Sequence, residues 1–216
     1  MADLILVAAS GLAREVLAVI RSAGHDRVIG FVDDDEAKWG TTLSGLPIFG
    51  GIHAAEDFSG AQLVLCAGKG IHREGIARRL GALGYRDDDY ATVVHESVEV
   101  PPTCSVEHGS ILLAGVVLTT DVTVARHVVA MPHVTLTHDN VIGSFVTLCA
   151  GTTLGGGVTV GERAYLGMSS SVREGVHIGA DAVLGMGAVL TRDMPSAQTW
   201  YGVPARPDFA TSEIPR

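Results

Sequence analysis

Apolar positions follow two different patterns in the two parts of the chain. Up to about residue 94, short apolar runs alternate with segments of helical periodicity. Strands are predicted at 4–8, 28–32 and 63–67, and helices at 13–23 and 71–83. Val16, Leu17 and Ile20 share one face of the first helix, and Gly24 provides its C-terminal stop. Strands that alternate with helices indicate a parallel sheet, so we predict a small Rossmann-like α/β domain over residues 1–94.

From residue 100 onwards, an aliphatic or small apolar residue recurs every six positions, and the register runs through sixteen positions without an insertion. These positions are Val100, Val106, Leu112, Leu118, Val124, Ala130, Leu136, Ile142, Leu148, Leu154, Val160, Leu166, Val172, Ile178, Leu184 and Leu190. Glycine often comes directly after such a residue, as at Gly143 and Gly161. A small or branched residue stands four positions after it, as at Val146 and Ala164.

A period of six matches neither a helix nor a strand. It is typical of a coil with three flat sides, in which each hexapeptide forms one side and its aliphatic residue points inward. We therefore predict an all-β left-handed parallel β-helix over residues 95–195, with about five coils and a height of roughly 24 Å at the usual strand spacing. The ends of such a solenoid need covers. We expect the N-terminal domain to cover one end and a tail, residues 196–216, to leave the prism and cover the other.

Composition and charge exclude several classes of protein. The chain is 47% hydrophobic but only 5% aromatic, which disfavours a conventional β-sandwich, and it has no apolar run long enough for a membrane span. A net charge of −9 disfavours nucleic acid as a partner. Cys66, Cys104 and Cys149 lie far apart, so they indicate neither a disulfide framework nor a zinc knuckle. The expected compartment is the cytoplasm.

Candidate chemistry in the repeat region centres on His138. It stands two residues after the inward Leu136, near a corner, where its side chain can leave the core. Histidine has an ordinary pKa of about 6.5, which suits a general base near neutral pH. The adjacent Asp139 would orient the imidazole or stabilise its charged form. The alternative interpretation is a solvated corner residue.

In the N-terminal part, polar residues follow the predicted strands. Ser10 and Gly11 come between a strand and a helix, where backbone N–H groups suit a phosphate. They do not form a G-x-G-x-x-G motif, which disfavours a dinucleotide site. Asp33 and Asp34 end the second strand, where carboxylates suit ribose hydroxyls, and Lys69 follows the third. Each of these residues also has an ordinary reading as a turn or surface residue.

Several segments together resemble one family. They are the hexapeptide run, the Thr-His-Asp-Asn-Val-Ile-Gly segment at 137–143, the Gly-Val-Pro-Ala-Arg segment at 202–206, and the short motifs at 9–15, 33–35, 67–69 and 94–97. The chain is similar in these segments, nearly from end to end, to the hexapeptide-repeat sugar O/N-acyltransferases, which include sialic-acid O-acetyltransferases and bacillosamine- and perosamine-type N-acetyltransferases.

The resemblance implies a function and an assembly. It implies transfer of an acetyl group from acetyl-coenzyme A, as co-substrate, to the 4-amino group of a nucleotide-linked 4-amino-4,6-dideoxyhexose, for surface polysaccharides such as lipopolysaccharide. His138 would be the general base, and no metal is implied. It also implies a homotrimer of parallel prisms with active sites between neighbouring subunits.

The resemblance further implies contacts for each co-substrate. Coenzyme A would run past Thr147, Gly156, Gly167, Met168, Met186 and Arg206. The nucleotide sugar would contact Ser10, Gly11, Leu12, Asp33, Asp34, Lys69, Met131 and His133. The chain departs from the family pattern at Met131, where relatives often carry Asn, and at Thr147, where many carry His. The backbone around Gly155, Gly156 and Gly157 either approaches a ligand closely or forms an ordinary tight corner.

Other functions compete with this interpretation. His133 and His138 have the five-residue spacing of two zinc ligands in gamma-class carbonic anhydrases, which share the β-helix. The position of the third histidine is Ser97, however, and His95 is out of register by two, so a zinc hydratase is disfavoured. A sialic-acid O-acetyltransferase and a non-catalytic nucleotide-sugar-binding protein stay open, as does the choice among UDP, dTDP and GDP.

Overall fold

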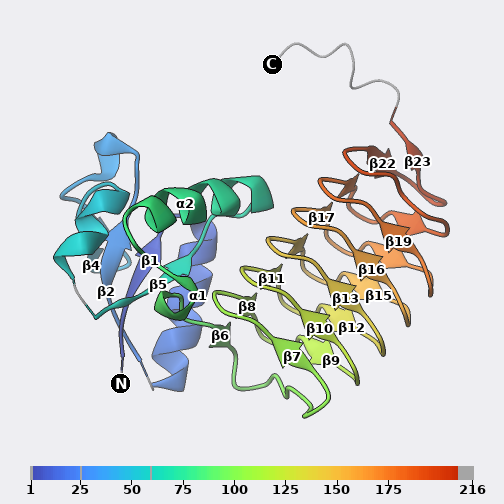
Figure 1. The fold of residues 1–216 in the computed structure, drawn as a ribbon, viewed down its shortest axis with the longest axis horizontal. Coiled ribbons are helices and arrows are strands. Elements are labelled where there is room, and N and C mark those ends of the chain that lie inside the picture. The colour runs from blue at the N-terminus through green and yellow to red at the C-terminus, as the bar shows by residue number, and fades with distance from the viewer. Residues whose placement is uncertain (1, 25, 59, 209–216) are drawn as a thin grey trace.

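The computed structural model describes residues 2–24, 26–58 and 60–208, and they form two parts (Figure 1). An N-terminal α/β domain lies beside a long three-sided prism built from stacked coils. Both predicted fold classes are confirmed, including the left-handed β-helix. No helix in the described ranges is long and apolar enough to cross a membrane.

The N-terminal domain is built on a three-stranded parallel sheet in the order β2-β1-β5. Its strands are β1 (Asp3–Val7), β2 (Arg27–Val32) and β5 (Gln62–Leu65), and its helices are α1 (Gly11–Ala23) and α2 (Gly70–Ala82). All five lie within two residues of the predicted ranges. α1 begins at its N-cap Ser10, whose hydroxyl accepts a hydrogen bond from Ala13 N, and it ends at Gly24, whose left-handed backbone (φ 67°) donates to Ile20 O.

Shorter elements complete this domain. They are η1 (Glu36–Lys38), the hairpin β3 (Thr42–Leu43) and β4 (Leu46–Pro47), η2 (Ile52–Asp57) and η3 (Asp87–Asp89).

The prism has three faces of parallel two-residue strands. The docking face, so called because it carries the N-terminal domain, consists of β6 (Val93–Val94), β8 (Ile111–Leu112), β11 (Val129–Ala130), β14 (Thr147–Leu148), β17 (Tyr165–Leu166), β20 (Val183–Leu184), β22 (Thr199–Tyr201) and β23 (Arg206–Pro207). The first open face consists of β7 (Ser105–Val106), β10 (Thr123–Val124), β13 (Val141–Ile142), β16 (Thr159–Val160) and β19 (His177–Ile178). The second open face consists of β9 (Val117–Leu118), β12 (Thr135–Leu136), β15 (Thr153–Leu154), β18 (Ser171–Val172) and β21 (Val189–Leu190).

The predicted register matches the strand pairing. Strands pair with those eighteen residues away, as Leu136 does with Leu154, so like residues stack in columns through the core. The residues four positions on, such as Val146 and Ala164, are also fully buried. Val100 is the exception: its side chain is 40% exposed and belongs to no strand, because the first regular coil begins only at β7.

The corners are made by a residue with left-handed backbone at every sixth position. Positive φ angles occur at each such position from Gly109 to Gly187, and eight of these residues are not glycine. The glycine that directly follows many of the inward residues has a different purpose. A Cβ on Gly161 would lie 2.5 Å from the backbone nitrogen of Ala180, so this glycine lets successive coils stack closely.

The tail covers the C-terminal end of the prism. At the C-terminal end, β22 continues the docking face by pairing with β20, and Trp200 packs in the prism core at 4% exposure. β23 then folds back against β22. The tail therefore adds a strand to the prism before it covers the end, and its last eight residues, 209–216, lie outside the described residues.

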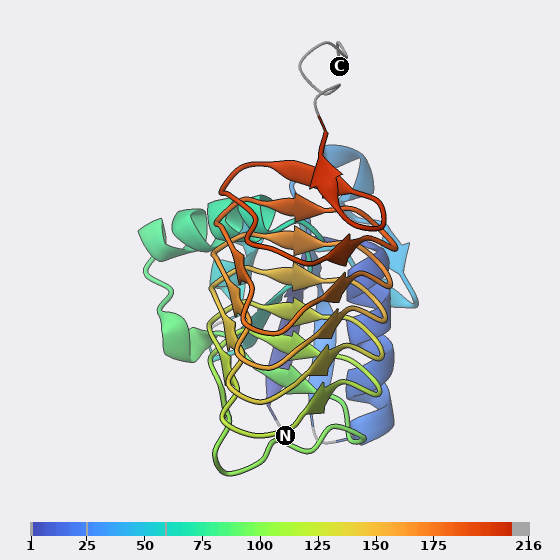
Figure 2. The ribbon, with the colours of Figure 1, turned by 90° about the vertical axis from the view of Figure 1, so that its right-hand side faces the viewer.

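The N-terminal domain packs along the docking face, beside the prism, and not over its end as the sequence analysis expects (Figures 1 and 2). One apolar cluster joins Leu4, Val16 and Phe31 to Ile111 and Val129 of the prism. β6, which the sequence places in the N-terminal domain, pairs with β8 of the prism. The two other faces are turned away from this contact, with the N-terminal domain behind the prism in Figure 2.

Candidate active site

His138 lies at the far corner, the edge where the second open face meets the first, opposite the docking face. Its Nδ1 lies 2.8 Å from Oδ2 of Asp139, and the two side chains are 62% and 65% exposed. A carboxylate can only accept a hydrogen bond, so Nδ1 carries the proton in this pair. Nε2 is then unprotonated in the neutral ring, which is the arrangement that a general base requires.

Gly156 leaves the space in which the His138 ring lies. A Cβ at Gly156 would be 2.2 Å from Cε1 of His138, so no other residue fits here with the ring in place. Gly155 lies against the backbone of Glu174, and Gly157 has a left-handed backbone and donates to His138 O at 2.8 Å. Each of the three glycines therefore meets a different structural requirement, and of the three only Gly156 lies against the imidazole ring of His138.

Asn140 braces this corner from inside, and the sequence analysis did not single it out. It is fully buried, and its Nδ2 donates to Gly155 O at 2.8 Å, which joins the coil of Gly156 to the coil of His138. Its Oδ1 has no partner. The available signal was a polar amide at one of the inward positions that elsewhere hold small or branched residues such as Val146.

The predicted coenzyme residues are distributed over the prism. Gly167, Met168 and Met186 lie at the corner between the docking face and the second open face, which we call the methionine corner. Met168 and Met186 are 51% and 73% exposed and lie one coil apart. Arg206 is exposed on β23, where its Nη1 donates to Ala205 O. Gly156 is separated from these residues by the second open face and lies at the far corner, beside His138.

Thr147 occupies a different place from the other predicted coenzyme contacts. Its side chain is fully buried on the docking face, donates to Gly68 O at 2.8 Å and accepts from Arg73 at 3.1 Å. A ligand cannot touch this hydroxyl as it is placed. Here the residue joins the prism to the N-terminal domain.

The predicted nucleotide residues of the N-terminal domain gather at the carboxyl ends of β1, β2 and β5, as expected for a parallel sheet. The Ser10 hydroxyl donates to Cys66 O at 2.7 Å, so the loops after β1 and β5 touch. Asp33 is 8% exposed and accepts hydrogen bonds from Ala9 N and Asp35 N, while Lys38 lies 3.0 Å from it. Asp33 thus holds the loops after β1 and β2 together.

The other residues predicted to bind the nucleotide sugar differ in exposure. Asp34 is exposed and pairs with Arg79 of α2, whose hydrogen bond lowers the pKa of the Asp34 carboxyl. Gly11 and Lys69 are exposed at the first turns of α1 and α2, and Leu12 is buried.

Met131 and His133 lie on the methionine corner near α1. Met131 packs against the apolar cluster shared by the two parts of the chain. His133 is exposed and lies over Gly115.

A single chain does not bring these groups together. The loop after β5 lies on the docking face, the methionines lie at one edge of that face, and His138 lies at the opposite corner. Within residues 2–24, 26–58 and 60–208, no three His, Cys, Asp or Glu side chains are grouped as a metal site would require.

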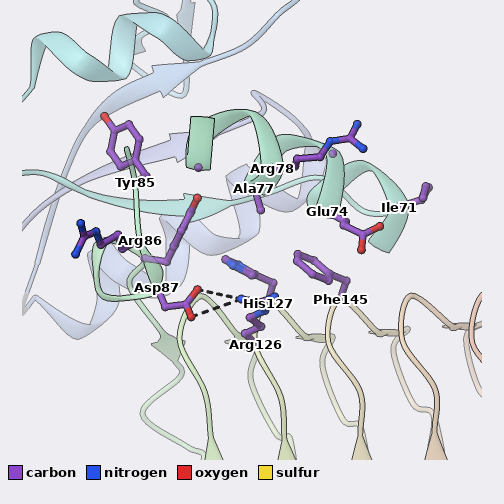
Figure 3. Close-up of a pocket in the computed structure, with 13 residues that line it drawn as sticks. Ile71, Glu74, Ala77, Arg78, Tyr85, Arg86, Asp87, Arg126, His127 and Phe145 are labelled. Carbon is purple, nitrogen blue, oxygen red and sulfur yellow. Dashed lines mark hydrogen bonds and ion pairs between the residues drawn. The ribbon is translucent and has the colours of Figure 1, made fainter. Parts of the chain in front are cut away.

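A separate cleft of about 610 Å³ opens between α2, the 85–90 segment and the prism. His127 and Phe145 form its base, and Arg126 pairs with Asp87 at its edge (Figure 3). Burial lowers the pKa of His127 to about 4, with the charges of Arg126 and Arg73 adding to the effect. None of the residues predicted to bind a co-substrate lines this cleft.

Two family models match the chain. The PglD N-terminal domain matches residues 3–80, and the hexapeptide repeat of succinyl-transferase matches residues 157–192. No curated protein matches the chain significantly.

Solved structures match nearly the whole chain. PerB from Caulobacter crescentus, in complex with CoA and GDP-perosamine, is 28% identical over 96% of this chain and 98% of that one, with a TM-score of 0.88. A mutant of perosamine N-acetyltransferase from the same organism, with the same two molecules bound, is 27% identical over 96% and 97%, also at 0.88. The acetyltransferase domain of PglB from Neisseria gonorrhoeae, with acetyl coenzyme A, is 24% identical over 95% and 98% at a TM-score of 0.85, and supports the fold.

Proposed function

With a PglD N-terminal domain and hexapeptide repeats in one chain, the protein belongs to the hexapeptide-repeat sugar acyltransferases, and from this premise we propose its reaction. It transfers the acetyl group of acetyl-coenzyme A to the 4-amino group of a nucleotide-linked 4-amino-4,6-dideoxyhexose. The observation that carries the proposal is the full-length match to PerB with CoA and GDP-perosamine. That match favours a GDP-linked, perosamine-like acceptor over UDP- and dTDP-linked sugars.

The chemistry needs one proton acceptor. The amine attacks the thioester carbonyl and forms a C–N bond, and the C–S bond then breaks to release the coenzyme thiolate. Nε2 of His138 takes the proton that the nitrogen loses, and the proton passes on to the thiolate or to water. Asp139 keeps Nδ1 protonated and stabilises the imidazolium while it exists. In this proposal, Gly156 lies beside the base, where its backbone allows a close approach of the thioester.

The site requires a second copy of the chain. His138 lies at the far corner, whereas the loop after β5 lies on the docking face of the same prism. We propose that the loops of one subunit and the far corner of its neighbour form one site. Coenzyme A would lie between the methionine corner of one prism and the far corner of the next. A homotrimer of parallel prisms supplies three such sites.

We propose that the acylated sugar serves surface-polysaccharide synthesis, including lipopolysaccharide, in the cytoplasm. The support for this is the acceptor class of the matching enzymes rather than any feature of the site.

Thiol release from acetyl-coenzyme A tests the proposal. The assay uses GDP-, UDP- and dTDP-linked 4-amino-4,6-dideoxyhexoses, with free sialic acid as a hydroxyl acceptor. We expect rapid release with a GDP-linked amino sugar. Release with sialic acid alone would establish O-acetylation instead. Absence of release and of coenzyme A binding would contradict an acyltransferase.

A further inference from the structure

We infer that Arg73 is a positioning residue for the nucleotide sugar, because its guanidinium fastens the loop after β5 to the docking face. This inference rests on the proposed function, in which that loop, residues 67–69, helps to hold the nucleotide. Arg73 lies on α2 and is fully buried.

The guanidinium makes six hydrogen bonds that span the two parts of the chain. They run from Nε to His127 O (3.0 Å), from Nη1 to Ala67 O (2.8 Å), Gly68 O (3.0 Å) and Thr147 Oγ1 (3.1 Å), and from Nη2 to Phe145 O (2.8 Å) and Val146 O (3.0 Å). Two acceptors belong to the candidate nucleotide loop, and the other four belong to two neighbouring coils of the prism. One side chain therefore fixes the position of that loop relative to the prism.

All six acceptors are neutral. Among the described residues, no carboxylate forms an ion pair with Arg73. Burial of an unpaired cation costs free energy, which the six hydrogen bonds must offset. Burial lowers the pKa of Arg73 to about 10, so the group still carries its charge at neutral pH. A planar group with five N–H donors instead supplies directional bonds in several directions at once.

Other contacts fix the same loop from both sides. Gly68 O also accepts from the Thr147 hydroxyl, and Cys66 O accepts from Ser10 at the start of α1. A Cβ on Gly70 would lie 2.1 Å from Phe145 O, so the first turn of α2 lies directly on the prism. The loop is thereby held between the prism and the candidate phosphate site of α1. Displacement of a binding group by about 1 Å is enough to weaken productive binding strongly.

Arg73→Lys tests this role, because it keeps a cation but reduces the donors from five to three and removes their planar arrangement. The matched control is Arg126→Gln, which removes an exposed arginine that also joins the two parts of the chain, through Asp87 at 3.2 Å. For Arg73→Lys we expect the KM for the nucleotide amino sugar to rise roughly 10- to 100-fold, since hydrogen bonds to a charged group are lost. The KM for acetyl-coenzyme A and the kcat at saturating sugar stay close to the wild-type values. The control keeps both KM values.

Hydrogen exchange of the full-length proteins gives a second readout that does not depend on activity. We expect the amides of residues 67–70 to exchange faster in Arg73→Lys, with the prism coils unchanged, and no such change in Arg126→Gln. A folded Arg73→Lys variant with wild-type exchange there, or with an unchanged sugar KM, overturns the inference. A wild-type protein that acetylates no nucleotide amino sugar overturns the proposed function instead, and the inference with it, whatever the exchange result.

Discussion

At the scale of single residues, the proposed chemistry depends on His138 and the residues around it. Asp139 sets which ring nitrogen carries the proton, Gly156 provides the space for the ring, and Asn140 braces the coil from within. Of these three, the sequence analysis identifies only Asp139 as a partner of His138, because the two are adjacent in the chain, whereas it assigns Gly156 to the coenzyme. The register of the repeat predicts that Asn140 points inward. Its hydrogen bond to Gly155, however, depends on how the following coil stacks against its own.

The first prediction concerns the base itself. His138→Asn removes the proposed proton acceptor but keeps a polar side chain at the corner. We expect kcat to fall by about 10²- to 10⁴-fold, the usual contribution of a general base, while the KM for acetyl-coenzyme A stays the same. Steady-state kinetics of thiol release measure both. The control is His177→Asn, an exposed histidine on β19. A kcat within threefold of wild type from pH 6 to 9 would leave positioning alone as the source of the rate.

A second prediction at this scale concerns His127. The pKa of this buried imidazole is about 4 in the folded chain against an ordinary value of 6.5. Between these values the unfolded chain binds a proton that the folded chain does not bind. The free energy of unfolding therefore falls as pH falls from 6.5 towards 4, by up to about 3 kcal/mol from this residue. Above pH 6.5 the ring is neutral in both states and its contribution is constant.

His127→Phe should flatten this pH dependence. Phenylalanine already occupies the equivalent left-handed corner position one coil away, at Phe145 (φ 62°), so the backbone accepts it. Urea denaturation at pH 7 and pH 5 measures the difference in free energy. The exposed His53 gives a control in His53→Gln, which we expect to keep the wild-type slope. An unchanged slope in His127→Phe would mean that other groups cause the acid sensitivity.

At the scale of elements, the sequence determines the prism almost completely. The period of six predicts both the inward residues and the parallel pairing at a spacing of eighteen, as with Leu136 and Leu154. It does not predict which glycines make corners. Asp139 and Phe145 adopt left-handed backbone without being glycine, whereas Gly161 is required by the closeness of the next coil. Such closeness depends on neighbours in space rather than on local sequence.

The third prediction separates these two uses of glycine. Gly161→Ala forces a Cβ against the backbone of Ala180, so we expect a loss of about 1–3 kcal/mol in the free energy of unfolding. Gly75→Ala, within α2 and in open space, should instead stabilise by roughly 0.5–1 kcal/mol, since alanine favours helix. Thermal and urea denaturation give both values. Equal effects of the two substitutions would contradict the packing argument.

At the scale of the whole molecule, the sequence does not show how its two parts are joined. Ile111 and Val129 look like ordinary prism residues, yet they pack in the same cluster as Leu4 and Val16. Arg73 looks like a surface arginine of an amphipathic helix, yet it is the most extensively hydrogen-bonded side chain of the contact between the two parts. Neither the shared apolar cluster nor the burial of Arg73 can be predicted from a pattern in the local sequence. The sequence therefore predicts which elements carry the candidate site residues but not how these elements lie relative to one another.

The fourth prediction tests whether two chains share a site. His138→Asn removes the proposed base at the far corner, and Asp33→Asn loosens the N-terminal loops that Asp33 joins. Each variant alone should have little activity. When both are co-expressed and the mixed oligomers are purified by two different tags, activity should return, because some interfaces combine two intact halves. The control is each variant carrying both tags. Mixed oligomers as inactive as the parents would place both halves of the site in one chain.

Because the coils of the prism stack regularly, distances along its axis change in equal steps. Each eighteen residues raise the chain by one strand spacing, about 4.8 Å, and return it to the same face. Each coil added between the N-terminal loops and the corner that carries His138 would therefore change their difference in height by one strand spacing. An insertion of six or twelve residues would rotate every later side chain onto a neighbouring face, while an insertion of eighteen would keep the face and change only the height. In this architecture, evolution can change the reach between two half-sites only in steps of one complete coil.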